Sequence, residues 1–474
     1  MDDPENDKNR KTQEYGIGIV RSFSEFRFSG FCGNRAGTEF VVTIKSRDMN
    51  PSVSRMQYLA PFLLMLFLYF IVGLFTVINQ QLQVPLQSAM FPRGGHFANA
   101  LVTLLNFSWF LAYPAAQGTG ARWIDRYGYK RTSVYAFGVF LGGLLIYELA
   151  VLMHIHFPSS FTLFGDEVSA GFFVFLLGSF LVGSAVTIIQ VVTNLYLSVS
   201  PVGRTTVLQR QMIGGTVNSL GMALGPLAVS YLLFRGIPLH RVTSGEFLFP
   251  VFGLMIAVAV MAWITGRVRM GDVCAVKRAS VTEDDEPEAS VWSFPQLKRG
   301  VWAIFFYVGV EVAVGANINL YAVGLDSRYG DAATHMAALY WAGLLVGRLI
   351  GSFFGKVPPQ RQLLGASVGA AALLVLTMVF GDPWILAGVG FFHSVMWPAI
   401  VTLAVKGLGE YTIRASGALM IGVVGGGVLP FLQGVLADAF HGDWRWTWVL
   451  VVLGEAYIFY YGLNGYRVRK TAEA

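Results

Sequence analysis

Cysteine and charge are both scarce in this chain. Of its 474 residues only 2 are cysteines, Cys32 and Cys274, and they lie far apart in the sequence. A disulfide framework, a cysteine cage for a metal ion and a redox motif all need more cysteines or a closer spacing. Charged residues make up only 13% of the chain, and the mean hydropathy is +0.56. These values exclude an ordinary soluble protein, and we expect no cofactor and no metal.

Hydrophobic residues are abundant instead. They supply 54% of the chain, about 256 residues, which at roughly 20 residues per bilayer crossing allows around a dozen spanning helices. Long apolar runs such as 172–182 and 373–380 exclude the short alternating strands of an outer-membrane barrel. The sequence therefore predicts an all-α integral membrane protein.

Apolar windows of about 19 residues predict twelve spans, which a long polar stretch divides six and six. The spans are expected near 58–82, 96–118, 132–153, 170–196, 208–234, 247–266, 300–323, 332–354, 362–380, 383–405, 412–437 and 444–466. The corresponding regions are an N-terminal tail (1–57), a first six-helix half (58–266), a central loop (267–299), a second six-helix half (300–466) and a C-terminal tail (467–474).

The basic residues predict how the chain is oriented. With both termini in the cytoplasm, 29 of the 34 Lys and Arg residues fall on the cytoplasmic side, as the positive-inside rule requires. The net charge of +6 therefore reflects membrane topology, and no nucleic-acid partner is expected. Two six-helix halves favour a transporter whose halves rock around a site at the midplane. A channel would need a filter or a ring of like residues, and the sequence shows neither.

The loop after the second span carries a charged motif. Residues 120–131 read Gly-Ala-Arg-Trp-Ile-Asp-Arg-Tyr-Gly-Tyr-Lys-Arg. This run resembles the signature loop of the major facilitator superfamily, with Ala121 where the family usually has glycine. The resemblance implies an ionic latch at the cytoplasmic rim, of about 1–3 kcal/mol; the alternative is a loop that only sets topology. The residues assigned to gating are Asp125, Arg126, Gly128, Lys130 and Arg131, with Arg348 at the corresponding place in the second half.

Three further segments narrow the resemblance. Residues 306–315 read Phe-Tyr-Val-Gly-Val-Glu-Val-Ala-Val-Gly, and residues 392–400 read Phe-His-Ser-Val-Met-Trp-Pro-Ala-Ile. Residues 424–438 read Val-Gly-Gly-Gly-Val-Leu-Pro-x-x-Gln-Gly-x-x-x-Asp. All three are similar to runs of the fucose/glucose/galactose proton-symporter family, and the likeness covers about residues 65–470. It implies transport of a hexose or related sugar, coupled to protons.

A sugar site also has chemical requirements of its own. Each sugar hydroxyl left unpaired costs about 1–3 kcal/mol, so the site needs hydrogen-bonding groups and an aromatic face. Polar side chains inside membrane spans usually face the bundle interior, where they line a cavity or, as an equal alternative for the amides, join helices. The candidates for sugar binding are Asn79, Gln80, Gln190, Asn194, Asn218, Glu311, Asn317, Asn319, His393, Trp397 and Gln433.

Proton coupling has two candidates, Glu311 and His393. A carboxylate inside a span is costly when charged, so Glu311 is expected to bind a proton or sugar hydroxyls. The resembled family commonly has Asn-Asp in its first helix, whereas this chain has Asn79-Gln80 and lacks that carboxylate. His393 stands where the family has Asn and titrates near neutrality, so it can replace the missing acid; the alternative is a neutral hydrogen-bonding imidazole. Glu455, in the last span, is expected to be structural.

The sequence thus favours a monomeric sugar transporter working by alternating access in a lipid bilayer, with a bacterial inner membrane as its expected location. Proton symport is narrowly preferred. The rivals are proton-independent facilitated diffusion of the same solutes and a non-transporting sensor on the same scaffold. Drug efflux is disfavoured because the interior candidates are rich in amides. An intramembrane enzyme has no support, since neither a His-Glu-x-x-His motif nor a nucleophile–base pair is present.

Overall fold

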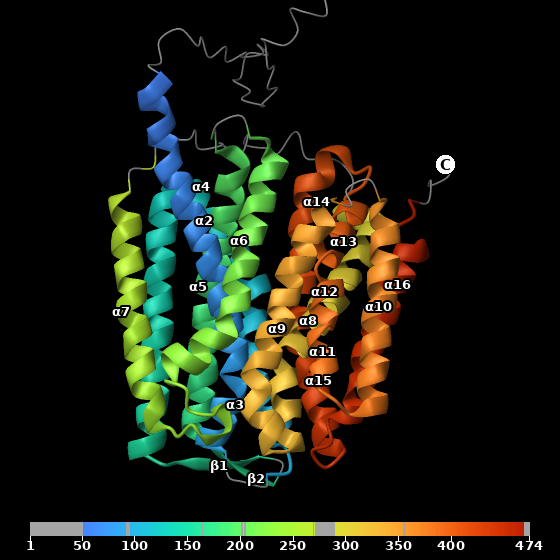
Figure 1. Cartoon of the computed structure of the whole chain (residues 1–474). Coiled ribbons are helices and arrows are strands. Elements are labelled where there is room, and N and C mark those ends of the chain that lie inside the picture. The colour runs from blue at the N-terminus through green and yellow to red at the C-terminus, as the bar shows by residue number, and fades with distance from the viewer. Residues whose placement is uncertain are drawn as a thin grey trace, which may run out of the picture. The chain divides into compact units, whose positions relative to one another are not determined.

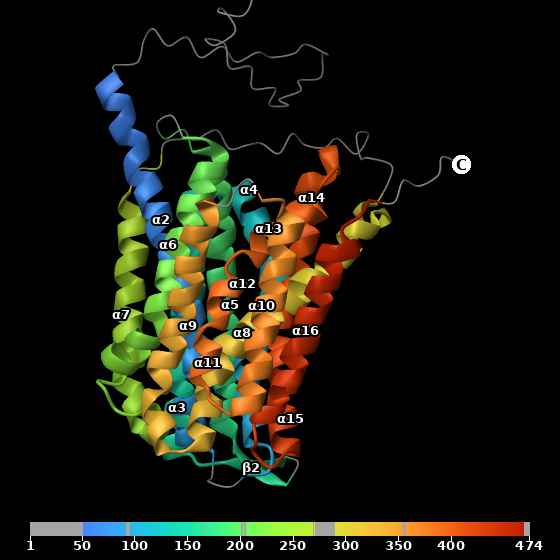
Figure 2. The same cartoon turned by 45° about the vertical axis from the view of Figure 1, so that its right-hand side comes forward.

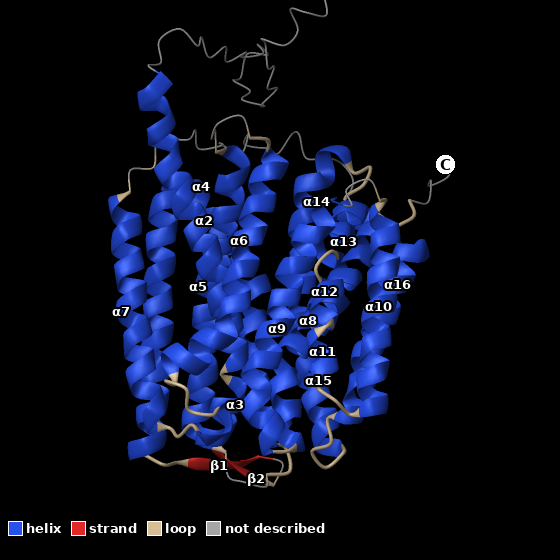
Figure 3. Ribbon diagram, viewed as in Figure 1, coloured by secondary structure: helices blue, strands red, loops and turns tan. Residues whose placement is uncertain are grey.

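Helices make up almost all of the described chain (Figures 1 and 3). The computed structural model describes residues 51–91, 95–163, 165–200, 202, 205–268, 270, 290–353 and 357–468. Most of the predicted N-terminal tail and central loop therefore lies outside the described residues. The helices discussed below belong to one compact unit, Arg55–Val273 with Glu288–Ala474, apart from the first four residues of the first helix.

The N-terminal half comprises the elements from α2 to α7. Its membrane helices are α2 (Pro51–Gln81), α3 (Gln83–Met90), α4 (Ala98–His156), α5 (Ala170–Val199), α6 (Val207–Leu227) with the π-helical η1 (Ala228–Leu233), and α7 (Gly245–Arg267). Between them lie an antiparallel hairpin of β1 (Ser160–Leu163) and β2 (Asp166–Ser169), and the short helix η2 (Leu239–Arg241).

The C-terminal half comprises the elements from η4 to η8, drawn from yellow to red in Figure 1. Its longer helices are α8 (Pro295–Leu325), α9 (Ser327–Phe353), α10 (Pro359–Phe380), α13 (Met396–Ala404), α14 (Thr412–Leu419), α15 (Gly425–Ala439) and α16 (Trp448–Tyr460). Its short helices are η4 (Val291–Ser293), α11 (Trp384–Ala387), α12 (Val389–His393), η5 (Gly409–Tyr411), η6 (Met420–Val424), η7 (Arg445–Thr447) and η8 (Tyr461–Gly465).

The twelve predicted spans correspond to eleven membrane-length apolar helices in the described chain, because α4 contains two of them. A straight helix of the 59 residues of α4 would be about 88 Å long, whereas a bilayer core is about 30 Å thick. Gly128 interrupts it with φ 75° and ψ 169°, a conformation that glycine alone adopts readily. The ring of Trp123 meets that of Tyr135 beyond this point at 6.1 Å, so the chain turns back there.

Two spans are broken by proline. Pro85 has no N–H to donate to the Gln81 carbonyl, so α2 ends at Gln81 and α3 continues the span to Met90. The predicted end of this span, residue 82, is therefore too early. Pro398 likewise cannot bond to Ser394, and α12 and α13 are separated there. Discontinuous helices are typical of transporter sites, since they free backbone groups and reposition side chains.

We call the end of the unit that holds β1, β2 and α3 the hairpin end (Figure 1). Polar contacts join the two halves here. The Asp438 carboxylate of α15 accepts from the backbone N–H of Ala100 at 2.7 Å and from the Asn99 amide at 2.8 Å, at the start of α4. The Tyr231 hydroxyl lies 3.2 Å from Nε2 of His335. These contacts hold the halves together at the hairpin end.

Candidate functional site

Asn79 is the centre of a hydrogen-bond network inside the N-terminal half. Its amide nitrogen donates to Oδ1 of Asn106 at 3.3 Å. Its Oδ1 accepts from the hydroxyls of Tyr147 at 3.1 Å and Ser179 at 2.9 Å. The cavity beside Asn79 has a volume of about 20 Å³. A single water molecule already needs about 10–15 Å³, so this cavity is too small for a sugar. The contacts favour helix–helix bonding, the alternative role for this residue.

Other predicted amides of the N-terminal half face the centre of the unit. The Tyr113 hydroxyl donates to Oε1 of Gln190 at 3.0 Å, and the Asn194 side chain meets Tyr69. Tyr69 and Tyr113 also interact electrostatically with each other. Asn218 instead donates to the backbone carbonyl of Tyr69 at 2.9 Å, which ties α6 to α2.

Glu311 and Arg348 meet this group from the C-terminal half. Glu311 is only 8% exposed, and its carboxylate interacts electrostatically with Arg348 and with Tyr113 of the other half. Arg348 lies inside α9, not in a loop. Its Nη1 donates to the Gly215 carbonyl at 3.2 Å and to the Ser219 hydroxyl, both on α6. The helices α6 and α9 lie side by side in both views (Figures 1 and 2).

We define the central cluster as the polar side chains that these interactions bring together from both halves. Its members are Tyr69, Tyr113, Gln190, Asn194, Tyr307, Glu311 and Arg348. Tyr307 interacts electrostatically with both Glu311 and Arg348, and the Trp397 ring lies 6.1 Å from its own. The cluster thus combines amides, hydroxyls, one carboxylate, one guanidinium and an adjacent indole, the groups that recognise a polyhydroxylated solute.

Some buried polar groups have no hydrogen-bond partner among the described residues. They include both side-chain polar atoms of Gln80 and of Gln83. Both glutamines are 1% exposed and flank the break between α2 and α3. A buried amide without a partner costs about 1–3 kcal/mol. Such groups are available to a ligand that carries hydroxyls.

Three other sugar candidates bond elsewhere. The Asn317 amide donates to Oε1 of Gln433 at 2.9 Å, and Gln433 donates to Thr447 at 3.1 Å, all within the C-terminal half. Asn319 donates to Oε1 of Gln81 at 2.5 Å, and Gln81 donates to the Gly315 carbonyl at 3.0 Å. The first pair joins helices within one half, and the second joins α2 to α8 across the halves.

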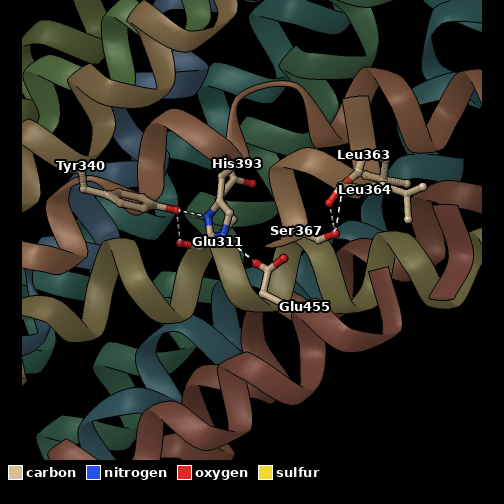
Figure 4. A network of polar contacts seen from close by, with 7 residues as sticks. All are labelled: Glu311, Tyr340, Leu363, Leu364, Ser367, His393 and Glu455. Carbon is tan, nitrogen blue, oxygen red and sulfur yellow. Dashed lines mark hydrogen bonds and ion pairs between the residues drawn. The ribbon is translucent and has the colours of Figure 1, made fainter. Parts of the chain in front are cut away.

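His393 lies in a third polar group, at the end of α12 (Figure 4). Its Nε2 is 2.8 Å from Oε1 of Glu455, and its Nδ1 is 2.8 Å from the Tyr340 hydroxyl. His393 has no exposed surface. It therefore contacts helix neighbours within the C-terminal half.

The predicted gating residues of the first half cluster at the turn within α4. Asp125, Arg126 and Arg131 are exposed, Lys130 is half-buried, and the Arg126 guanidinium lies 5.3 Å from the centre of the Tyr127 ring. Gly128 makes the turn itself. Arg348 does not belong to this turn: it lies in α9, bonds to α6 and interacts electrostatically with the Glu311 carboxylate.

Some site residues are absent from the sequence-based candidates. Gln81 and Gln83 belong to the same polar run as Asn79 and Gln80, inside an otherwise apolar span, and this run is the signal that would have found them. Tyr69 and Tyr113 carry no such signal, because aromatic residues are common in membrane helices.

Comparisons with known proteins agree with this architecture. Residues 57–423 match the sequence model of the Major Facilitator Superfamily. A glucose/galactose transporter of Brucella abortus is 30% identical over 374 residues, which cover 76% of this chain and 84% of the relative. An L-fucose-proton symporter of Haemophilus influenzae is 21% identical, covering 89% of this chain and all of the relative. The crystal structure of a D-xylose-proton symporter covers 86% of this chain and 98% of its own, with a TM-score of 0.63 and 16% identity.

Proposed function

Because the chain belongs to the Major Facilitator Superfamily, we propose that it moves a hexose or related sugar across a bilayer by alternating access of its two halves, coupled to protons. The names of the similar proteins support this substrate class and this coupling. The sugar crosses unmodified, through a monomer, and the expected location is a bacterial inner membrane.

The observation that carries the proposal is the central cluster. It draws hydroxyl and amide groups from the N-terminal half, and a carboxylate and a guanidinium from the C-terminal half. A solute bound between the halves contacts both of them, so its binding free energy depends on how they are arranged. That dependence is what an alternating-access carrier requires.

Sugar recognition is assigned to the groups that are in the cluster or lack a partner. Gln190 and Asn194 supply amides, and Gln80 and Gln83 supply donors and acceptors that nothing in the described chain satisfies. Trp397, beside Tyr307, supplies an apolar face for the sugar ring. Asn79, Asn218, Asn317, Asn319 and Gln433 act indirectly in this proposal, by holding the helices that carry these groups.

Proton coupling is assigned to Glu311 through Arg348. An ionised Glu311 attracts the guanidinium of Arg348, and a protonated Glu311 does not. Arg348 also bonds to Gly215 and Ser219 on α6 of the other half. The protonation of Glu311 therefore changes how firmly Arg348 joins the two halves, which couples proton binding to their movement.

The charged turn of α4 is proposed as a gate. Asp125, Arg126, Lys130 and Arg131 surround Gly128, where the backbone requires glycine. Exposed charges of this kind form ionic contacts in one conformer and release them in the other, which biases the two-state equilibrium. Arg348 serves the same purpose deeper in the unit.

A proton-independent facilitator is the second candidate. It is favoured by Gln80 and Gln190, since neither is titratable and both lie among the groups assigned to the sugar. On this alternative Glu311 binds sugar hydroxyls and stays in one protonation state.

Uptake of labelled glucose, galactose and fucose into proteoliposomes, with and without an inward proton gradient, tests the proposal. We expect accumulation above equilibrium with the gradient, and equilibration only in Glu311→Gln. Glu167→Gln serves as the matched control, because Glu167 is an exposed carboxylate on β2. Accumulation that persists in Glu311→Gln would remove the coupling role of Glu311. Equilibration that ignores the gradient in the wild type would favour the facilitator.

A further inference from the structure

Three buried side chains form a hydrogen-bonded chain that ends at Glu311 (Figure 4). The imidazole of His393 lies between Glu455 of α16 and Tyr340 of α9, at 2.8 Å on each side. The Tyr340 hydroxyl also lies 2.9 Å from the backbone carbonyl oxygen of Glu311 on α8. Tyr340 and His393 have no exposed surface, and Glu455 is 1% exposed. Four helices therefore meet through this chain.

The directions of these bonds follow from the chemistry of the groups. A backbone carbonyl can only accept, and a tyrosine hydroxyl has one proton to donate. Tyr340 therefore donates to the Glu311 carbonyl and must accept from His393. The Nδ1 atom of His393 thus carries a proton.

One further proton must lie between His393 and Glu455. Without it, the Nε2 lone pair would face a buried carboxylate at 2.8 Å, with no donor between them. Oε2 of Glu455 has no hydrogen-bond partner among the described residues. Burying an unpaired charge costs much more free energy than burying an unpaired neutral polar group. An oxygen without a partner is therefore far less costly on a neutral carboxylic acid than on a carboxylate. The proton therefore sits on Glu455, and the imidazole is neutral.

We propose that Glu455 is a positioning residue for Glu311, acting through His393 and Tyr340, and that its proton stays in place throughout transport. The retained proton orients His393, His393 orients Tyr340, and Tyr340 holds the Glu311 carbonyl on α8. This inference rests on the proposed transport function, since Glu311 is the group being placed. In this arrangement Arg348 remains the positively charged group that interacts with the Glu311 carboxylate.

The surroundings of the pair are consistent with a retained proton. The titratable groups facing it are Tyr307 and Glu311 on α8 and Tyr340 on α9. Helix α10 presents Ser367, whose hydroxyl donates to the Leu363 carbonyl of its own helix at 2.9 Å (Figure 4). Glu311 is the one base among these groups, and the chain ends at its backbone carbonyl, not at its carboxylate.

Two substitutions at Glu455 separate positioning from proton carriage. In Glu455→Gln the amide nitrogen can donate to Nε2 as the acid does, so every bond direction is kept. We expect its KM for sugar, its gradient-driven accumulation and its pH profile to stay within about twofold of wild type. In Glu455→Leu nothing replaces the donor, His393 can change tautomer, and Tyr340 can turn away from Glu311. We expect gradient-driven accumulation to fall about tenfold, because Glu311 is the group assigned to proton coupling.

Tyr340→Phe provides a second route to the same effect if Glu455→Leu does not fold, because it removes the hydroxyl that meets Glu311. Loss of accumulation with preserved equilibration in Glu455→Gln would overturn the proposal, since the pair would then carry the transported proton. Wild-type accumulation in Glu455→Leu or Tyr340→Phe would also overturn it.

Infrared spectroscopy locates the proton without any substrate. The difference spectrum of wild type against Glu455→Gln should show the carbonyl stretch of a protonated carboxylic acid, unchanged as the external pH is varied around neutrality. A carboxylate band would overturn the assignment. If the wild type moves none of the three sugars, the proposed function fails while this spectrum still decides where the proton lies.

Discussion

Each half of the molecule contains a buried polar network, but the two networks differ in chemistry. The N-terminal network joins Asn79 to an amide and two hydroxyls, all of them neutral. The C-terminal network contains an imidazole and a carboxyl, and it ends at the backbone of Glu311. Both solve the same packing problem, since polar groups in membrane helices must find partners. Of these two networks, only the C-terminal one contains a carboxyl and an imidazole, which can hold a proton.

The contacts between the halves differ from both networks. Asp438 caps the start of α4, and Arg348 reaches the backbone and a hydroxyl of α6. These two sets of bonds lie on half-buried side chains that can release one partner and bond to water, whereas Asn79 and His393 are enclosed, as is the Gln81–Asn319 pair that also joins the halves. Halves that are internally bonded and more weakly joined can move as rigid bodies, as alternating access requires.

The N-terminal network should be the harder of the two to break. Asn79→Leu removes one donor and one acceptor. Asn106 and Tyr147 each lose a bond, and Ser179 keeps only its bond to the Leu105 carbonyl, so we expect a loss of about 3 kcal/mol in the free energy of unfolding. None of these groups titrates near neutrality, so the loss should be the same on either side of pH 7.

Thermal unfolding in detergent at several pH values measures this. Thr187→Val is the matched control, because the buried Thr187 hydroxyl donates to the Gly183 carbonyl of its own helix. A loss in Asn79→Leu no larger than that of Thr187→Val would remove the distinction between an enclosed network and a single local bond.

Removing one hydroxyl from the C-terminal network should lower the free energy of unfolding by less than Asn79→Leu does. In Tyr340→Phe, His393 loses its acceptor and the Glu311 carbonyl loses one of two partners, which predicts about 1–2 kcal/mol. Tyr460→Phe, at an exposed hydroxyl on α16, should be nearly neutral. The same unfolding assay applies, and equal losses in the two tyrosine variants would show that the chain to Glu311 contributes no stability.

The sequence predicts the positions of the membrane spans better than it predicts where single side chains lie. Span positions follow from local hydropathy, and the structure places them within a few residues, except where Pro85 splits the first span and extends it to Met90. Arg348, assigned to the gate by its likeness to the loop of the first half, lies within α9. Hydropathy cannot show which helix face a residue occupies, and a side chain's depth depends on that face.

For the same reason, the sequence could not show which candidate site residues come together and which bond elsewhere. Gln190, Asn194 and Glu311 come together, whereas Asn317 and Gln433 bond to each other. All are polar residues inside apolar runs, and no local pattern separates them. Their partners lie on helices distant in sequence, so only the packing of the helices decides which residues meet.

The bonds between the halves should be weaker than those within them. Asp438→Asn replaces an acceptor of charged hydrogen bonds at the start of α4 with a neutral one, and we expect the closed hairpin end to lose about 1 kcal/mol, roughly a fivefold shift in the equilibrium. Labelling of a cysteine introduced at Thr103, which is fully buried and faces Gly434 of the other half, reports opening of this end. Asp326→Asn, at an exposed carboxylate that bonds only to the nearby Tyr329 N–H, is the control. Unchanged labelling would mean that Asp438 does not hold the halves together.

The smallest effect should come from Ser219→Ala, which removes one of the two α6 partners of Arg348 and leaves the Gly215 carbonyl. A single bond of this kind between membrane helices contributes about 0.6 kcal/mol, so the equilibrium should shift about threefold and unfolding should hardly change. Ser184→Ala is the control, since the Ser184 hydroxyl bonds to its own helix at Phe180. Because the attraction of Glu311 competes with the α6 bonds of Arg348, the shift should grow in a Glu311→Gln background, where that competition is gone. An unchanged shift there would separate Arg348 at the interface from the protonation of Glu311, and the proton site and the moving interface would be independent.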